Sequence, residues 1–232
     1  MVSSELIPAQ SDAHLLERID DVRIDVVRLA SMTADAVSAG TQALLEGDLD
    51  AANRLVADDD AVDALRHAIE DQCLAILGRP GLAAPDLRFV GVAMRTAHEL
   101  ERSADLMVNV AKAVWRLFPH QLDPTVSRII ERLGRQAVVQ IRVAINAFAD
   151  RDPSWAAALA DMDETIDELE KSLFRHILEN AGPPDDATVL RAVQLTLVAR
   201  HYERIGDHAV TIAKQVHFVV TGEHSGRRRP RR

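Results

Sequence analysis

The feature that most constrains the fold is a repeat, because Glu-Arg-x-x-Asp occurs twice, at residues 101–105 and 203–207. With a shift of 102 residues, the stretches 101–112 and 203–214 share Glu, Arg, Asp, Val, Ala and Lys at matching positions. A repeat of this length between two apolar helical stretches indicates a duplicated structural unit. We therefore expect two similar halves, each carrying its own copy of the acidic pair.

Apolar residues recur at spacings of three and four along most of the chain, whereas the alternating patterns of strands are nearly absent. Glycine and proline divide this pattern into six segments. The expected helices cover about residues 12–46, 48–77, 86–118, 124–150, 154–181 and 186–220. Asp123 followed by Pro124 is a strong helix start, and Asp185 or Asp186 is expected to cap the last helix.

Short connections between these segments place sequential helices antiparallel. The sequence therefore predicts an all-α fold, a tandem pseudo-repeat of two antiparallel three-helix bundles. The first bundle is expected at residues 12–119 and the second at residues 123–221, and their short junction predicts a shared interface. Residues 1–11 are expected to be a flexible N-terminus, and residues 222–232 a disordered Arg-rich tail.

The net charge of −9 conceals an asymmetry between the tail and the rest of the chain. Residues 223–232 hold five arginines and one glutamate, so the other 222 residues carry −13. An acidic body argues against general nucleic-acid binding, which needs clustered Lys and Arg. The tail is interpreted as a solubilising end, with contact to an acidic partner or lipid headgroups as the alternative.

Targeting and redox features are sparse. No run of 18 uncharged apolar residues occurs, and the first residues have neither the basic nor the apolar region of a secretory signal. The lone Cys73 lies in an apolar helical stretch, where it fits the role of a small buried hydrophobe. These observations favour a cytoplasmic location.

Each acidic pair has a partner about 40 residues earlier, on the preceding predicted helix. Asp59 and Asp63 share the pattern Asp-x-x-x-Asp-x-Leu with Asp163 and Asp167. Carboxylates at i and i+4 lie one helical turn apart on the same face. If adjacent helices turn these faces toward each other, four carboxylates converge in each bundle. The expected metal ligands are Asp59, Asp63, Glu101 and Asp105 in the first bundle, and Asp163, Asp167, Glu203 and Asp207 in the second.

Four carboxylates suit hard cations such as Mg²⁺, Mn²⁺ or Fe³⁺, and Zn²⁺ is also compatible. A single acidic pair carries little weight, because 36 acidic residues among 232 should give about five or six such pairs by chance. Asp21 and Asp25 are interpreted as one of these ordinary solvated pairs. Solvated acidic faces, or salt bridges to Arg102 and Arg204, remain the alternatives to metal binding.

Other chemical signatures are lacking. None of the nine histidines has an acidic residue three positions earlier, which argues against a ferritin-like di-iron site. The sequence contains no Walker or Rossmann phosphate loop, no His-Glu-x-x-His and no Gly-x-Ser-x-Gly. His208 has Leu106 as its counterpart in the first repeat, and it is interpreted as structural or solvated. The chain is therefore not expected to be an enzyme.

From about residue 12 to 221, the sequence resembles the PhoU family of phosphate-signalling regulators. The most specific part is the segment Tyr-Glu-Arg-Ile-Gly-Asp-His-Ala-Val-Thr-Ile-Ala at residues 202–213, which is similar to the family's C-terminal signature. The segments at residues 43–48 and 59–63 are similar to the region of the family's first two helices. In the first repeat, Ser103-Ala104 stands where the second has Ile205-Gly206, so the first site is expected to differ in geometry.

The resemblance implies a cytoplasmic accessory protein that couples the ABC phosphate importer and its ATPase to a membrane sensor histidine kinase. Such a protein keeps the phosphate-starvation response repressed when phosphate is plentiful. Similar family members bind multinuclear iron or zinc through Glu/Asp-x-x-x-Asp motifs, which implies the eight ligands named above. We also expect a homodimer that reaches the membrane only through its partners. The alternatives are a carboxylate-bridged metal enzyme or metal store, and a helical adaptor without metal.

Overall fold

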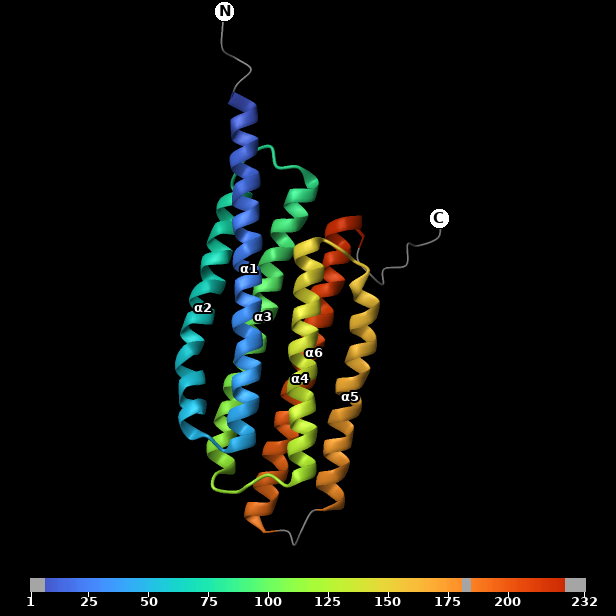
Figure 1. Ribbon diagram of the computed structural model, residues 1–232. Coiled ribbons are helices and arrows are strands. Elements are labelled where there is room, and N and C mark those ends of the chain that lie inside the picture. Colours follow the sequence, from blue (N-terminus) through green and yellow to red (C-terminus); the bar gives the residue numbers. More distant parts are fainter. Residues whose placement is uncertain (1–6, 181–184, 224–232) are drawn as a thin grey trace, which may run out of the picture.

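The computed structural model describes residues 7–180 and 185–223, and within these residues it contains six helices and no strand. The helices are α1 (Ile7–Glu46), α2 (Leu49–Leu77), α3 (Ala84–Leu117), α4 (Pro124–Asp150), α5 (Trp155–Glu179) and α6 (Asp186–Thr221). Figure 1 shows α1–α3 packed side by side, with α4–α6 forming a second bundle beside them. The predicted all-α architecture of two three-helix bundles is confirmed.

The predicted starts of α4 and α6 are confirmed, and in both helices an aspartate side chain caps the backbone. The Asp123 carboxylate accepts hydrogen bonds from the backbone N–H groups of Thr125 and Val126 at the start of α4. Asp185, rather than Asp186, caps α6 by accepting from the Thr188 N–H. These bonds satisfy donors that the first helical turn leaves free.

Two helices begin earlier than the periodicity predicts. Helix α3 begins at Ala84, before the expected residue 86, with Pro85 inside its first turn. Proline is tolerated there because the first-turn N–H groups have no helical acceptor in any case. Helix α1 begins at Ile7 rather than at residue 12. Residues 1–6 of the predicted N-terminus and 224–232 of the predicted tail lie outside the described residues.

The two bundles share an interface, as the short junction predicts. Helix α1 packs against α4, and α3 packs against α6. Gly134 makes the first contact possible, because a Cβ atom there would lie 2.4 Å from Thr41 Oγ1 and 3.0 Å from Thr41 Cβ. The buried Tyr202 hydroxyl lies 2.7 Å from Thr41 Oγ1, which in turn donates to the Val37 carbonyl. The core is thus continuous from one bundle to the other.

Candidate functional site

The first acidic quartet comprises Asp59 and Asp63 on α2 and Glu101 and Asp105 on α3. Burial raises the pKa of Asp59 to about 6, with further contributions from the charges of Asp105, Asp63 and Glu101. Burial also raises the pKa of Glu101, and Asp105 and Asp63 add to this effect. The structure therefore brings together all four predicted side chains of this unit, since each lies within electrostatic reach of its neighbours.

The second acidic quartet comprises Asp163 and Asp167 on α5 and Glu203 and Asp207 on α6. Burial raises the pKa of Asp163, followed by the charges of Asp207 and Asp167. Burial likewise raises the pKa of Glu203, again with Asp207 as the leading charged contributor. The same helix pairing thus recurs in both units. In each quartet three carboxylates are half-buried, and the last aspartate is exposed.

Three buried carboxylate oxygens in the quartets have no hydrogen-bond partner. They are Glu101 Oε2 in the first quartet, and Asp163 Oδ1 and Glu203 Oε2 in the second. Glu101 Oε2 lies 3.5 Å from His98 Nδ1. Buried acceptors without partners are costly. These oxygens are therefore the points at which a positively charged ligand would stabilise the structure most.

The side chains as they stand do not form a preassembled metal centre. Within residues 7–180 and 185–223, no three Asp, Glu, His or Cys side chains are arranged so that they could hold one metal ion. The eight predicted ligands lie in two groups of four, one group in each bundle. Their coordination of metal stays a prediction.

Two charged residues beside the second quartet are not among those predicted from the sequence. Arg200 Nη1 lies 2.5 Å from Glu203 Oε1 and 4.0 Å from Glu170 Oε1. Glu170 also helps to raise the pKa of Glu203. It follows Asp163 by seven residues, so helical periodicity alone could have placed it on the same face. Arg200 precedes Glu203 by three residues, so the same periodicity could have placed it beside Glu203, and only its contact with Glu170 depends on how α5 and α6 pack.

The predicted difference between Gly206 and Ala104 has a structural basis. A Cβ atom on Gly206 would lie 2.8 Å from Gln140 Oε1 and 2.9 Å from Asp163 Oδ1. The absent side chain thus lets an acidic oxygen of the second quartet approach the α6 backbone. In the first unit, Ala104 and Asp59 instead line a groove of about 560 Å³ between α1 and α2. The two quartets have different surroundings.

His208 lies at the contact between α3 and α6. It is buried, with Nδ1 2.9 Å from Ser103 Oγ and Nε2 3.8 Å from Glu99 Oε2. The pKa of His208 is lowered to about 4, first by burial and then by the nearby charges of Arg102 and Arg204. A neutral imidazole bonded across the interface is a structural element. The lone Cys73 is also buried, as its apolar sequence context predicts.

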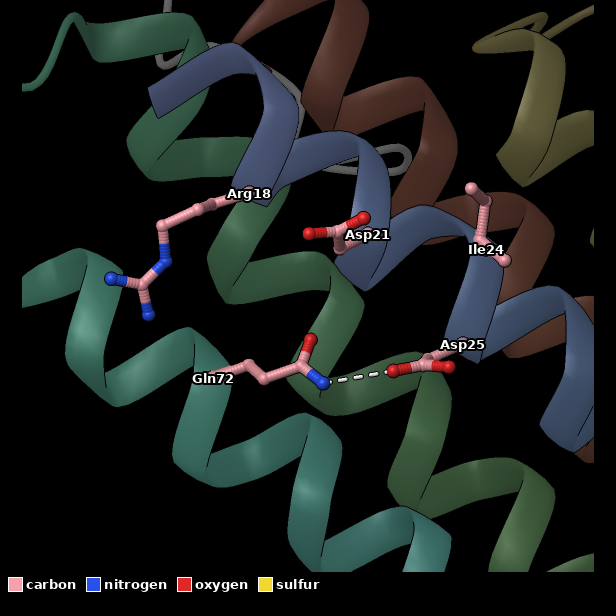
Figure 2. Close-up of a pocket in the computed structure, with 5 residues that line it drawn as sticks. All are labelled: Arg18, Asp21, Ile24, Asp25 and Gln72. Atoms are coloured by element: carbon pink, nitrogen blue, oxygen red, sulfur yellow. Dashed lines mark hydrogen bonds between the residues drawn. The ribbon is translucent and has the colours of Figure 1, made fainter. Parts of the chain in front are cut away.

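Asp21 and Asp25 line a cleft of about 380 Å³ between α1 and α2, shown in Figure 2. Gln72 on α2 donates a hydrogen bond of 2.8 Å to Asp25 Oδ2, and Arg18 lines the same cleft. Asp21 is exposed and Asp25 half-buried. The interpretation as a wholly solvated pair is therefore wrong for Asp25. An amide donor on α2 holds it, a long-range contact that sequence spacing does not reveal.

Among the described residues, none of the helices combines the length and the apolar content needed to cross a bilayer.

Sequence comparison places both repeats in one family. The model of the PhoU domain matches residues 26–114 and again residues 130–216. A phosphate-specific transport system accessory protein PhoU homolog from Rhizobium meliloti (strain 1021) is 29% identical over 225 residues, which is 95% of this chain and 94% of the relative. Homolog 1 from Mycobacterium tuberculosis (strain H37Rv) is 30% identical over 207 residues, covering 89% of this chain and 92% of the relative.

Solved structures agree with this assignment. The phosphate transport system regulatory protein PhoU from Streptococcus pneumoniae superimposes with a TM-score of 0.81 at 26% identity, covering 90% of this chain and 98% of that one. PhoU from Pseudomonas aeruginosa superimposes with a TM-score of 0.82 at 28% identity, covering 89% and 99% of the two chains. With two matched repeats, relatives of full length and the same tertiary structure, the chain belongs to the PhoU family.

Proposed function

We propose that this chain is a cytoplasmic regulator of phosphate homeostasis, and that it represses phosphate uptake and the starvation response when phosphate is plentiful. The observation that carries the proposal is the match of the PhoU domain to both halves of the chain. Relatives that align over nearly their whole length are named accessory proteins of the phosphate-specific transport system. The chain is proposed to couple the ATPase of the ABC phosphate importer to a sensor histidine kinase.

The proposed mechanism is docking without catalysis. Two bundles with a continuous core form a body that can present separate faces to two partners. Phosphate status would change which contact is populated, because a ligand-linked equilibrium moves toward the state that is bound more tightly. The proposal includes a homodimer, which sedimentation of the purified protein would test.

Metal binding is a second part of the proposal. The quartets offer oxygen donors only, and three of their buried oxygens have no partner, so the residues fit a hard cation. Iron or zinc is the proposed metal, with magnesium or manganese as alternatives. When bound, the metal would supply the positive charge that offsets repulsion between the carboxylates. Asp59, Asp63, Glu101 and Asp105 would hold it in the first unit, and Asp163, Asp167, Glu203 and Asp207 in the second.

A carboxylate-bridged metal enzyme or metal store is the other candidate. The same unpartnered carboxylate oxygens favour it. The names of the relatives favour the regulator, since they describe accessory and regulatory proteins. Turnover assays with dioxygen and with phosphoesters, on protein loaded with iron or zinc, separate the two functions. Turnover that is lost with the quartet carboxylates would support the enzyme.

Deletion of the gene in its host tests the regulatory function. Expression from a promoter induced by phosphate starvation should rise in phosphate-rich medium, and the wild-type gene supplied in trans should restore repression. An unchanged reporter in the deletion strain would contradict the proposal. Elemental analysis of protein purified without chelator or affinity metal tests metal binding independently of that result.

A further inference from the structure

A patch of large apolar side chains lies on the surface of the second bundle, near the end of α5 and the beginning of α6. Each of these side chains is between 44% and 62% exposed. We call this set the apolar patch; it consists of Phe174 and Leu178 on α5 and Val189, Leu190, Val193 and Leu197 on α6. Single exposed apolar residues are common, but a cluster of six on two adjacent helices indicates an interaction surface.

The register of α5 and α6 places the residues of the patch at matching heights. The contact between Arg200 and Glu170 fixes which turns of the two antiparallel helices face each other. Phe174 lies one turn beyond Glu170 along α5, and Leu197 lies about one turn before Arg200 along α6. These two residues therefore lie at about the same height on neighbouring helices. Leu178 extends the same face by one further turn on α5, as does Val193 on α6.

The first bundle shows that the fold does not require apolar residues at this place. Aligning the repeats through their quartets matches Phe174 with Glu70, Val193 with Gly91 and Leu197 with Arg95. Leu190 matches Arg88 in the same alignment. Leu178 and Val189 match Leu74 and Leu87, which are also exposed and apolar. The first bundle thus presents charged side chains or glycine at four of the six positions, and the apolar character of these four belongs to the second bundle.

The size and surroundings of the patch favour one occupant. Six half-exposed side chains provide an area on the order of a few hundred Å², whereas a stable interface between two copies needs about 800 Å² on each side. An amphipathic helix docks through a few apolar anchors at positions i, i+3, i+4 and i+7. One helical turn from Phe174, Glu170 adjoins the second acidic quartet, where Arg200 is a neighbouring cation. A helix with basic residues at that end fits both parts.

We propose that the apolar patch docks a single amphipathic helix of a partner protein, with the helix's Lys and Arg residues lying toward Glu170 and the second quartet. The inference rests on the proposed function, in which the chain acts by docking, and it adds the surface and the chemistry of the partner. A helix bound to the apolar patch would place apolar side chains at spacings of three and four against Phe174, Val193 and Leu197. Its basic end would offset the excess of carboxylates.

Two synthetic helical peptides of about 18 residues provide the test. Both carry the same stripe of leucines, but one ends in arginines and the other has glutamates in their place. Binding to the full chain is measured by fluorescence anisotropy in the presence of chelator, so that no metal competes for the carboxylates. The Arg peptide should bind the wild-type chain, and the Glu peptide should bind at least about tenfold more weakly.

The decisive variant transfers the residues of the first bundle, Phe174→Glu with Leu197→Arg. It should weaken binding of the Arg peptide by at least about tenfold. The control is Leu74→Ser with Leu87→Ser, which removes the exposed apolar side chains of the first bundle that match Leu178 and Val189, and it should leave binding unchanged. Circular dichroism melting checks that both variants fold. If the first variant does not fold, Phe174→Ser with Leu197→Ser replaces it and should weaken binding in the same direction.

Equal binding by the wild type and the folded patch variant would overturn the proposal, as would equal binding of the two peptides. Sedimentation measures the oligomeric state of the wild type and of the patch variant. A wild-type dimer that becomes monomeric in the patch variant would assign the surface to a second copy of this chain and would also overturn the proposal of a partner helix. The proposed function is judged separately by the starvation-promoter reporter. Repression can thus hold while peptide docking fails, or fail while docking holds.

Discussion

The two acidic quartets carry the same four side chains, yet different structures lie behind them. In the second unit, Asp163 approaches the α6 backbone at Gly206, where no side chain intervenes. In the first unit, Ala104 occupies the equivalent position, and Asp59 borders a groove of about 560 Å³. Duplication has preserved the charges and their spacing, whereas the packing around them has diverged.

The surface beside each quartet differs in the same way. Beside its quartet the second unit has Phe174, Val193 and Leu197 where the first unit has Glu70, Gly91 and Arg95, while the outer positions of the patch are apolar in both units. The quartets are therefore common to both repeats. The surfaces beside them, which a partner would recognise, differ between the repeats. A variant that carries the residue of one unit at the matching position of the other therefore tests function with a side chain that already occurs there in the other repeat.

The largest expected effect concerns Tyr202, whose counterpart in the first unit is Leu100. Both are fully buried, but only the tyrosine hydroxyl reaches across to Thr41. Tyr202→Ala should lower the free energy of unfolding by about 3–5 kcal/mol, because it leaves a large cavity. Tyr202→Phe should cost about 1 kcal/mol, the net value of one buried hydrogen bond. Chemical denaturation measures both, and equal costs would show that the ring packing has no separate importance.

A smaller effect is expected where the two bundles meet at Gly134. Alanine there would place Cβ within 3.0 Å of three Thr41 atoms, including the Thr41 Cβ, which cannot rotate away. Gly134→Ala should therefore destabilise the chain by about 1–3 kcal/mol. Gly91→Ala is the matched control, since no atom lies within 4 Å of its added Cβ and α3 is helical there. It should stabilise the chain by about 0.5–1 kcal/mol. A loss at both sites would show that the close contact with Thr41 is not what makes the substitution costly.

Local and periodic features were predictable from the sequence. Asp123 and Asp185 cap helices because their carboxylates reach backbone groups only two or three residues away. The quartets were predictable because residues four apart share a helix face. The unusual backbone approach at Gly206 was also signalled, by the difference between the two repeats at that position.

Contacts between distant segments were not predictable in the same way. The hydrogen bond between Ser103 and His208, and that between Thr41 and Tyr202, join residues that are more than 100 positions apart. Each depends on which helices pack together and at what height, which a pattern along one helix does not specify. The contact of Arg200 with Glu170 has the same origin. These residues differ between the repeats, so the duplication gave no second copy from which to infer them.

The quartets should also differ in their response to pH. The pKa of Asp59 rises from 3.8 to about 6 in the folded chain. The native state therefore binds more protons than the unfolded state between these values, so that stability falls as the pH rises through about 6. Asp59→Asn should remove this loss and stabilise the chain at neutral pH, by less than about 1 kcal/mol because the carboxylate is only half-buried and solvent screens its charge.

The counterpart Asp163→Asn provides the comparison. The pKa of Asp163 is also raised, with burial as the leading cause and with Lys214 opposing the rise. Its effect on the pH dependence should have the same sign and be smaller than that of Asp59→Asn. Denaturation midpoints measured between pH 4 and pH 7 test the order, in buffers that contain chelator. A larger effect at Asp163 than at Asp59 would contradict the expected electrostatic difference between the units.

The smallest effect in the absence of metal concerns the acidic pairs themselves. Replacing both Glu203 and Asp207 by Ala relieves like-charge repulsion of a few tenths of a kcal/mol per pair. With chelator present, the melting temperature should therefore rise slightly or stay constant. Replacing Glu101 and Asp105 by Ala in the first unit should act in the same direction. These small shifts set the reference against which added metal is judged.

Added metal should reverse the sign of that effect in one unit at a time. A cation bound only to the native state stabilises it by mass action, so its loss lowers the melting temperature. Two carboxylates of one helix supply too few of the oxygen ligands that hard cations prefer, and both helices of a unit are therefore needed. The Glu203→Ala/Asp207→Ala variant should lose only the metal of the second quartet, and the Glu101→Ala/Asp105→Ala variant only that of the first. Metal content and melting that are unchanged in both variants would show that the ligands lie elsewhere. Loss of both metals from either variant would mean that the two quartets are coupled through the shared core, and the comparison between independent units would no longer hold.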